Sequence, residues 1–282
     1  MRAFVAGSAG QLGSALVRAL GDRVAWAGGR EALDVRDPDA VLREVRAAQP
    51  DVVINATAYN QVDAAETGTV EAMAVNAAGP GHLARAAREV GASIVHVSTN
   101  YVFDGIKRTP YDEEEPARPL SAYGVSKLAG EMLVRASGVP FLLVRTSAVF
   151  GAGGSRGKGG SFVERMLARA RAGEALRVVD DQVLSPTYAP DLAAAMVALL
   201  QAGVRGLFHV TNAGSCSWHA LAVAALRQAG LDAAMVQPIT SRDLGAPAAR
   251  PSYSVLSNER YQSLGLPPLR TWEAALADLL GR

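Results

Sequence analysis

Two side chains that can exchange a proton stand four residues apart, at Tyr123 and Lys127. This spacing puts both on one face of a helix. A free phenol has a pKa near ~10 and is a poor acid at neutral pH, but a neighbouring ammonium favours the phenolate and lowers that pKa. Pairs of this kind are common on surface helices, so the spacing alone predicts no activity.

A hydroxyl from a neighbouring strand is expected to join this pair. Residues 93–98 are apolar and β-branched enough for a buried strand, and Thr99 and Asn100 follow it directly. Open α/β sheets bind their ligands at the carboxyl ends of the strands. Thr99, Tyr123 and Lys127 therefore predict a proton-transfer site beside a nicotinamide ring.

A glycine-rich turn near the amino terminus predicts where the dinucleotide carrying that ring binds. Gly7, Gly10 and Gly13 follow the first predicted strand and open the first predicted helix. Small residues let the backbone approach a pyrophosphate, and the free N–H groups of a helix N-terminus favour its charge. The G-x-x-G-x-x-G spacing differs by one step from that of many dehydrogenases, and a tight turn without a ligand is the alternative interpretation.

The end of the second predicted strand indicates which dinucleotide binds. It lacks the acidic residue, about 20 positions on, that holds a ribose 2′-hydroxyl in NAD enzymes. Arg30 stands there instead and suits a 2′-phosphate, which favours NADP; a solvated surface arginine is the alternative. Asp34 and Val35 are expected near the adenine.

The rhythm of the chain predicts the elements that position these residues. Short apolar segments alternate with longer Ala/Leu/Arg-rich ones through the first 150 residues. This alternation predicts an α/β fold, a Rossmann-type doubly wound parallel sheet. The glycine-dense segment 151–160, expected to be poorly ordered without ligand, separates a dinucleotide-binding domain (1–150) from a smaller, mainly substrate-binding C-terminal region (151–282) that packs partly onto it.

Composition excludes several other classes of protein. The 282 residues include 28 Lys+Arg and 27 Asp+Glu, so no general charge attracts nucleic acid or an anionic membrane. One cysteine allows no internal disulfide or thiolate metal cluster. Apolar runs break well before the roughly 18 residues of a membrane span, and no export signal is recognisable. The sequence thus predicts a soluble, cytoplasmic protein without metal, nucleic-acid or membrane partners.

Several segments, in order, give the chain a specific resemblance along nearly its whole length. It resembles the dTDP-4-dehydrorhamnose reductase family of extended short-chain dehydrogenases/reductases. The matching segments are 7–13, 51–59 with 62–66, 98–105, 123–127 with 130–131, 145–147, and 181–182 with 186–187.

The resemblance implies a reaction and a role for each site residue. Hydride would pass from NAD(P)H, with NADPH favoured over NADH, to C4 of a nucleotide-linked 4-keto-6-deoxy sugar, giving a dTDP-L-rhamnose-type product without a metal. Tyr123 would protonate the developing alkoxide, Thr99 would assist, and Lys127 would hold the nicotinamide ribose and lower the pKa of Tyr123. Besides Tyr123 and Lys127, the expected cofactor-binding residues are Gly7, Gly10, Gln11, Leu12, Gly13, Arg30, Asp34, Val35, Ala56, Ala58 and Tyr59.

Four positions depart from the family pattern. Asn100 replaces an aspartate, Ala148 a sugar-contacting tryptophan, and Tyr253 an asparagine. Ala15 replaces a glutamate that serves a magnesium-bridged dimer in some members, so that dimer is not inferred, although a homodimer stays open. The residues expected at the substrate are Thr99, Asn100, Ala148 and Arg250, the last with a surface ion pair as an equally good interpretation.

Two alternatives to this function remain open at this stage. The altered sugar pocket allows a reductase of a different nucleotide sugar. A protein resembling the regulatory subunit of methionine adenosyltransferase would keep the NADP-binding fold without catalysis. The intact Thr99, Tyr123 and Lys127 argue against the regulatory subunit.

Overall fold

Six parallel strands form the central sheet of the computed structural model, which describes residues 1–153 and 160–281. Their order is β10-β5-β4-β3-β1-β2. Because β2 lies on one side of β1 and β3 on the other, the strand order reverses between β1 and β3. Ala6, at the end of β1, lies opposite Gly28 on one side and Asn55 on the other. The strands are β1 (Ala3–Ala6), β2 (Val24–Gly28), β3 (Val52–Asn55), β4 (Ser93–Thr99), β5 (Phe141–Thr146) and β10 (Gly206–His209).

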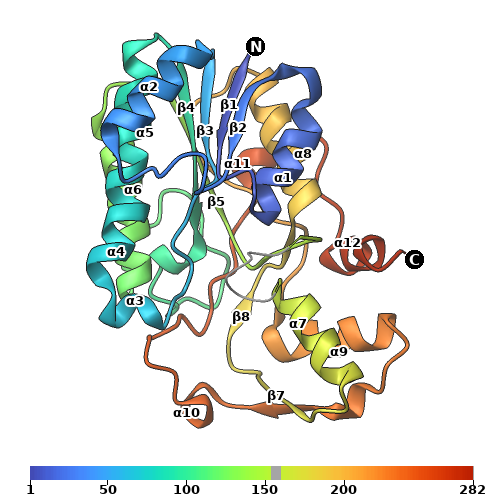
Figure 1. The fold of residues 1–282 in the computed structure, drawn as a ribbon. Coiled ribbons are helices and arrows are strands. Elements are labelled where there is room, and N and C mark those ends of the chain that lie inside the picture. Colours follow the sequence, from blue (N-terminus) through green and yellow to red (C-terminus); the bar gives the residue numbers. More distant parts are fainter. Residues whose placement is uncertain (154–159, 282) are drawn as a thin grey trace.

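Helices cover both faces of this sheet because both faces of its strands are apolar. In β1, Phe4 and Val5 point to opposite faces and belong to two separate hydrophobic clusters. One face is covered by α1 (Gln11–Leu20) and α8 (Ala189–Gln201), and the other by α2 (Pro38–Ala48), α5 (Gly79–Glu89) and α6 (Ala122–Ala136) (Figure 1). The predicted Rossmann-type doubly wound sheet is confirmed.

Short helical segments connect these layers. The two that bear on the site are the π-helical turn η2, which runs between α4 and α5, and η3, which follows β4. The connecting segments are η1 (Gly21–Arg23), α3 (Ala64–Thr67), α4 (Thr69–Met73), η2 (Ala74–Ala78), η3 (Asn100–Val102) and α11 (Glu259–Gln262).

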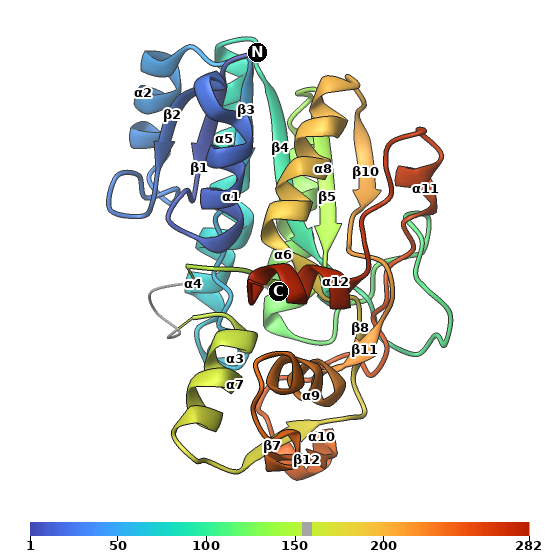
Figure 2. The same cartoon turned by 90° about the vertical axis from the view of Figure 1, so that its right-hand side faces the viewer.

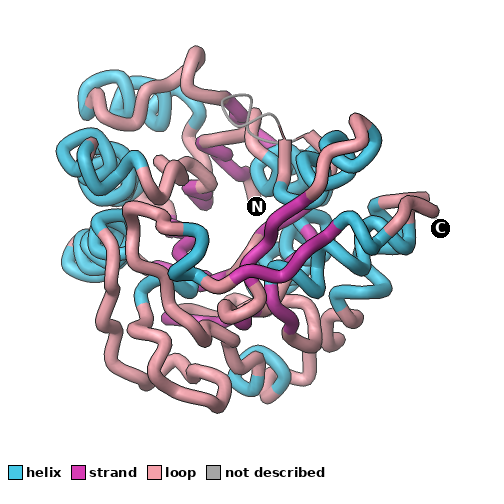
Figure 3. Tube along the Cα trace, turned by 90° about the horizontal axis from the view of Figure 1, so that it is seen from below, coloured by secondary structure: helices cyan, strands magenta, loops and turns pink. Residues whose placement is uncertain are grey.

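A smaller region with its own hydrophobic cluster lies below the carboxyl ends of the strands (Figure 1). From below, paired strands lie in front of its helices (Figure 3), and α12 lies between the sheet and α9 (Figure 2). Its main elements are α7 (Phe162–Arg171), β7 (Leu176–Val179), α9 (Trp218–Gln228), η5 (Ala233–Met235), β12 (Val236–Ile239), α10 (Ser241–Leu244) and α12 (Trp272–Leu279).

Two further two-stranded sheets are formed by short strands. They are β6 (Val149–Phe150) with β9 (Thr187–Tyr188), and β8 (Val183–Leu184) with β11 (Cys216–Ser217). Both α8 and β10 come from beyond residue 150 yet belong to the sheet layers. The division at 150 stays a prediction, and most of the glycine-dense segment 151–160, namely 154–159, lies outside the described residues.

Candidate active site

The glycine turn packs main chain directly against main chain at the end of β1. Gly7 has φ +90°, and a Cβ on it would lie 2.7 Å from the carbonyl carbon of Ala56. A Cβ on Gly13 would lie 2.0 Å from the Gly7 carbonyl oxygen. At Gly10 the nearest atom to such a Cβ is 3.4 Å away, so packing does not demand glycine there. A bare backbone at that position fits the close approach of a ligand.

The first turn of α1 offers groups suited to an anion. Gly10 caps the helix without a side-chain hydrogen bond, and no acidic residue lies in the first turn. The N-terminal N–H groups are thus left to a phosphate or solvent. Gln11 Oε1 is buried without a partner among the described residues, while the Leu12 side chain belongs to the core. Leu12 can therefore reach a dinucleotide only through its main chain.

Charged residues gather beyond the end of β2, where the adenosine half of a dinucleotide is expected. Arg30 is 72% exposed, with Nη2 3.6 Å from Glu71. Arg36, which the sequence patterns did not indicate, binds Glu71 at 2.8 Å. It also donates hydrogen bonds to the Asp34 carboxylate, and these bonds lower the pKa of Asp34 to about 2. Val35 is buried. Arg30 is accessible to a 2′-phosphate, whereas the Asp34 side chain is already engaged.

The loop after β3 approaches the glycine turn from the neighbouring strand. The Ala56 N–H donates to the Ala6 carbonyl at 2.9 Å, and Asn55 Oδ1 accepts the Thr57 N–H at 3.0 Å. Ala58 is exposed and Tyr59 partly so. The loop therefore borders the point where the strand order reverses, which is the usual ligand crevice of such sheets.

Asn76 is a site residue that sequence reasoning missed. It sits in the π-helical turn η2, fully buried, and its side chain accepts the Tyr59 N–H at 2.8 Å and donates to the Tyr59 carbonyl at 2.9 Å. A third bond reaches Ser126 Oγ on α6 at 3.0 Å. Such turns often mark functional positions. A lone asparagine in an alanine-rich helical segment was the available signal.

The structure brings the three predicted catalytic side chains together at the carboxyl end of β4. Ser121 caps α6 by accepting the Gly124 N–H, which starts the helix so that Tyr123 and Lys127 face β4. Thr99, the last residue of β4, hydrogen-bonds the Tyr123 hydroxyl. Lys127 Nζ donates to the Val97 carbonyl at 2.6 Å, and the residue is only 3% exposed. Their catalytic roles stay predictions.

Burial sets the protonation of this site, and it corrects one expectation. Lys127 was expected to lower the pKa of Tyr123, but the net shift is upward: burial raises the pKa of Tyr123 to about 12, against the opposing effect of the Thr99 hydrogen bond. Burial lowers the pKa of Lys127 to about 8, and the nearby Glu131 carboxylate opposes this shift. Tyr123 is thus a protonated donor at neutral pH.

A buried ion pair anchors the catalytic helix to the sheet. Glu131, one turn after Lys127, accepts from Arg145 Nε at 2.9 Å and Nη2 at 2.7 Å, and both side chains are at most 5% exposed. Bidentate pairing of this kind fixes orientation. The pair therefore holds α6 against β5 and fixes the height of Tyr123 above the strand ends.

Two of the residues predicted at the substrate have unusual settings. Asn100 is 3% exposed, and both polar atoms of its amide are engaged, by Thr99 at 3.2 Å and by Ser254 at 2.7 Å. Ala148, after β5, is partly exposed and has φ +41°, which a non-glycine residue rarely adopts. The amide of Asn100 therefore has few hydrogen-bonding positions left for a substrate, whereas Ala148 is partly accessible.

Arg250 forms the ion pair that was the alternative interpretation of its role. Its guanidinium binds Asp63 through two bonds of 3.0 and 2.8 Å and also hydrogen-bonds the Tyr101 hydroxyl. These contacts hold Arg250 beside η3, the short helix that directly follows Thr99. Contact with a substrate phosphate stays a prediction.

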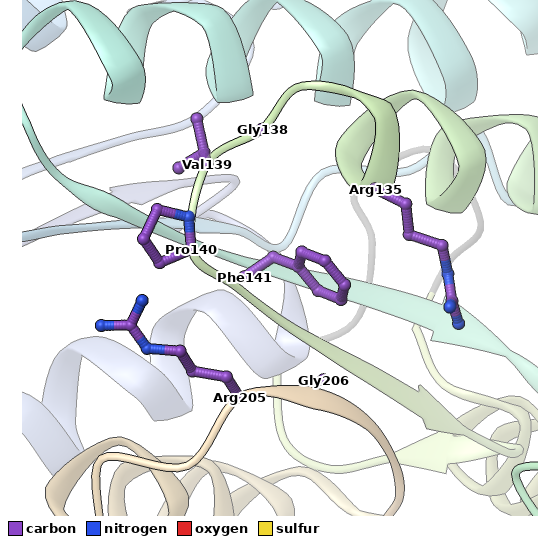
Figure 4. A pocket seen from close by; sticks show the side chains of 7 residues that line it. All are labelled: Arg135, Gly138, Val139, Pro140, Phe141, Arg205 and Gly206. Atoms are coloured by element: carbon purple, nitrogen blue, oxygen red, sulfur yellow. The ribbon is translucent and has the colours of Figure 1, made fainter.

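Two pockets among the described residues lie away from the Thr99–Tyr123 pair. A pocket of about 550 Å³ lies at the amino ends of β5 and β10, the opposite edge of the sheet from Thr99, with Pro140 and Phe141 between two arginines (Figure 4). A pocket of about 300 Å³ lies beside Arg250. It is lined by Gln182, Ser241, Arg242, Leu244, Ala246, Ala248, Ala249 and Arg250.

Within residues 1–153 and 160–281, no group of three or more His, Cys, Asp or Glu side chains could hold a metal ion. No helix in these ranges is both long and apolar enough to cross a membrane.

Sheet, turn and hydroxyl pair together define a class of protein. A doubly wound parallel sheet with an uncapped helix N-terminus at its switch point is the dinucleotide-binding α/β architecture. The glycine turn and loop 55–59 provide the surface on which a dinucleotide fits, beside the Thr99–Tyr123 pair.

Comparison with known proteins identifies the family. The model of the RmlD substrate binding domain family matches residues 1–282. The dTDP-4-dehydrorhamnose reductase of Streptomyces griseus is 42% identical over 98% of this chain and 92% of its own. A solved dTDP-4-dehydrorhamnose reductase from Clostridium acetobutylicum superposes with a TM-score of 0.93 at 36% identity, covering 100% and 99% of the two chains. The chain therefore belongs to the dTDP-4-dehydrorhamnose reductase family.

A further solved relative bears on the cofactor. The dTDP-4-dehydrorhamnose reductase of Bacillus anthracis, solved in complex with NADP, is 33% identical over 99% of this chain and 98% of its own, with a TM-score of 0.92.

Asn76→Ala is expected to weaken NADPH binding about tenfold, because two hydrogen bonds that hold the Tyr59 main chain are lost. NADPH fluorescence titration gives the dissociation constant. Ser126→Ala is the matched control, since it removes the third partner of Asn76 and leaves both bonds to Tyr59 in place. Equal affinities in the two variants would contradict the role given to Asn76.

The rate of reduction is expected to fall above about pH 8, because Lys127 loses its proton there and the charge beside the acid disappears. Arginine stays protonated throughout the accessible range. In Lys127→Arg the residual activity should therefore lack this alkaline limb. A limb near pH 8 that persists in the variant would show that another group titrates.

Proposed function

We propose that this protein is an NAD(P)H-dependent reductase of a nucleotide-linked 4-keto-6-deoxy sugar, with dTDP-4-dehydrorhamnose as substrate and a dTDP-L-rhamnose-type product. The observation that carries the proposal is the hydrogen-bonded Thr99–Tyr123 pair at the carboxyl end of β4, in a chain of this family. The enzyme transfers a hydride to a carbonyl of a sugar nucleotide.

The first group of residues binds the cofactor. The turn from Gly7 to Gly13 and the N-terminus of α1 bind the pyrophosphate, and Arg30 binds the 2′-phosphate. The bound nicotinamide supplies the hydride. Lys127, held by its bond to the Val97 carbonyl, would bind the nicotinamide ribose beside Tyr123.

Tyr123 provides the proton for the reduced oxygen. Its raised pKa keeps it protonated at neutral pH, while its acidity must increase as charge develops on the substrate oxygen. Thr99 fixes the direction of the hydroxyl. As negative charge grows on the carbonyl oxygen, Tyr123 donates its proton, and the product is a neutral alcohol.

A second candidate is reduction of a different nucleotide sugar. Ala148 favours it, because a methyl group at a position where the family usually has tryptophan leaves a wider pocket. A panel of nucleotide 4-keto sugars, followed by loss of NADPH absorbance, separates the two candidates. Greatest kcat/KM with dTDP-4-dehydrorhamnose supports the first.

The remaining assignments belong to the same proposal. Residues 1–150 form the dinucleotide-binding domain and 151–282 mainly bind the substrate, with Asn100, Ala148 and Arg250 near the sugar nucleotide. The protein works in the cytoplasm without a nucleic-acid partner, consistent with its near-zero net charge.

Tyr123→Phe is expected to lower kcat by a factor on the order of 10² to 10⁴, because the proton donor is removed while ring and fold remain. NADPH oxidation in the presence of dTDP-4-dehydrorhamnose measures the loss. Tyr261→Phe is the matched control: it removes another tyrosine hydroxyl, bonded to the Pro267 carbonyl. Wild-type turnover in Tyr123→Phe would exclude Tyr123 as the acid.

We propose that the protein is a homodimer joined through α6. Met132 and Leu133 follow Val125 by seven and eight residues on this helix, and the three residues are 61%, 45% and 47% exposed, respectively. This is an apolar stripe on a helix that otherwise covers the core. Sedimentation should show a dimer that Met132→Glu converts to monomer, whereas the exposed Leu264→Glu leaves it intact; a monomeric wild type would contradict this.

A further inference from the structure

A strap formed by residues 248–257 joins the substrate region to the catalytic edge of the sheet. The chain leaves α10 and climbs to α11 beside the sheet (Figure 1). On the side of the smaller region, Val183 donates its N–H to the Ser252 carbonyl at 2.9 Å and accepts the Ser254 N–H at 2.8 Å. On the other side, Ser252 Oγ donates to the Gly105 carbonyl at 3.0 Å.

From this strap, hydrogen bonds run to the predicted proton donor through buried side chains. Asn100 Nδ2 donates to Ser254 Oγ at 2.7 Å, and Thr99 Oγ1 donates to Asn100 Oδ1 at 3.2 Å. Thr99 in turn bonds Tyr123. Thr99, Asn100 and Ser254 are each at most 8% exposed, so water does not readily replace these partners.

The side-chain amide of Asn100 determines which group donates in each of these hydrogen bonds. An amide nitrogen only donates and an amide oxygen only accepts. The single proton of the Thr99 hydroxyl therefore points to Asn100, and the Thr99 oxygen accepts the Tyr101 N–H at 3.2 Å. Because that proton is engaged, the bond between Thr99 and the neutral Tyr123 must use the proton of the tyrosine. In this arrangement Tyr123 is oriented by an acceptor before it meets substrate.

The same bonds can rearrange once the proton has moved. At 3.2 Å, the bond from Thr99 to Asn100 is long for two oxygens. When Tyr123 has given its proton to the substrate oxygen, the Thr99 hydroxyl can turn from Asn100 and donate to the phenolate. No further proton enters or leaves the site in this step.

We propose that Asn100 and Ser254 are positioning residues that tie the proton donor of the reductase to the strap. The strap also carries Arg250, whose guanidinium binds Asp63 and Tyr101. The orientation of the Tyr123 hydroxyl therefore depends on one bond from the strap, between Ser254 Oγ and Asn100, and not on the strap's other contacts. This inference rests on the proposed function, and it gives Asn100 a positioning role in place of direct substrate contact.

Three variants test the link. Ser254→Ala removes the acceptor of Asn100 and should lower kcat about tenfold, with KM and the dissociation constant for NADPH changed less than twofold. Asn100→Leu should behave in the same way. The double variant should be no slower than Asn100→Leu alone, because both changes break one chain of bonds.

Ser252→Ala is the matched control. It removes a hydroxyl from the same strap, two residues away, that bonds a carbonyl of the first region without touching Thr99. It should leave kcat within twofold of the wild type. Ser254→Thr keeps the hydroxyl and should restore most of the activity lost in Ser254→Ala, and thermal melting followed by circular dichroism identifies variants that do not fold.

Three results would overturn the inference. They are a kcat in Ser254→Ala equal to that of Ser252→Ala, an effect on KM alone, or losses that multiply in the double variant. If Ser254→Ala does not fold, Asn100→Leu compared with Ser252→Ala decides by the same split between kcat and KM. A wild-type protein that reduces no nucleotide sugar would instead refute the proposed function itself.

Discussion

The contact of bare backbone at Gly7 and Gly13 is the constraint on which the rest of the structure depends. A Cβ on either residue would lie within 2.7 Å of a main-chain atom, so α1 can follow β1 this closely only with glycine there. The contact places the helix N-terminus over the reversal of strand order, beside loop 55–59. A dinucleotide can then lie along the strand ends with its nicotinamide toward β4 and α6.

Burial determines the geometry and the protonation of the side chains at the carboxyl end of β4. Lys127 and the pair Glu131–Arg145 lie almost wholly inside the protein, and each charge is fixed by a directed bond. Buried ion pairs often add little to stability, but they define geometry. Here they hold α6 at one height and angle, so the proton donor meets the end of β4. The same burial keeps Tyr123 protonated at neutral pH and brings the pKa of Lys127 into the working range.

Local sequence patterns predicted the sheet class, the glycine turn and the convergence of Thr99 with α6, because strand ends and helix spacing follow from periodicity. Long-range contacts were not predictable in this way. Asn100 and Ser254 are 154 positions apart, and nothing local to either indicates the other. Nor did the pattern show that β10 completes the sheet, that Asn76 holds Tyr59, or that burial raises the pKa of the Tyr123 phenol.

The central claim is that this chain delivers hydride to C4 of a nucleotide-linked sugar. The most direct measurement uses NADPH carrying deuterium in the transferred position, with dTDP-4-dehydrorhamnose as acceptor and NMR of the product. The structure and the family predict one deuterium, bonded to C4 of a 6-deoxyhexose. A label at another carbon, or no labelled sugar at all from folded protein that binds NADPH, would contradict the account.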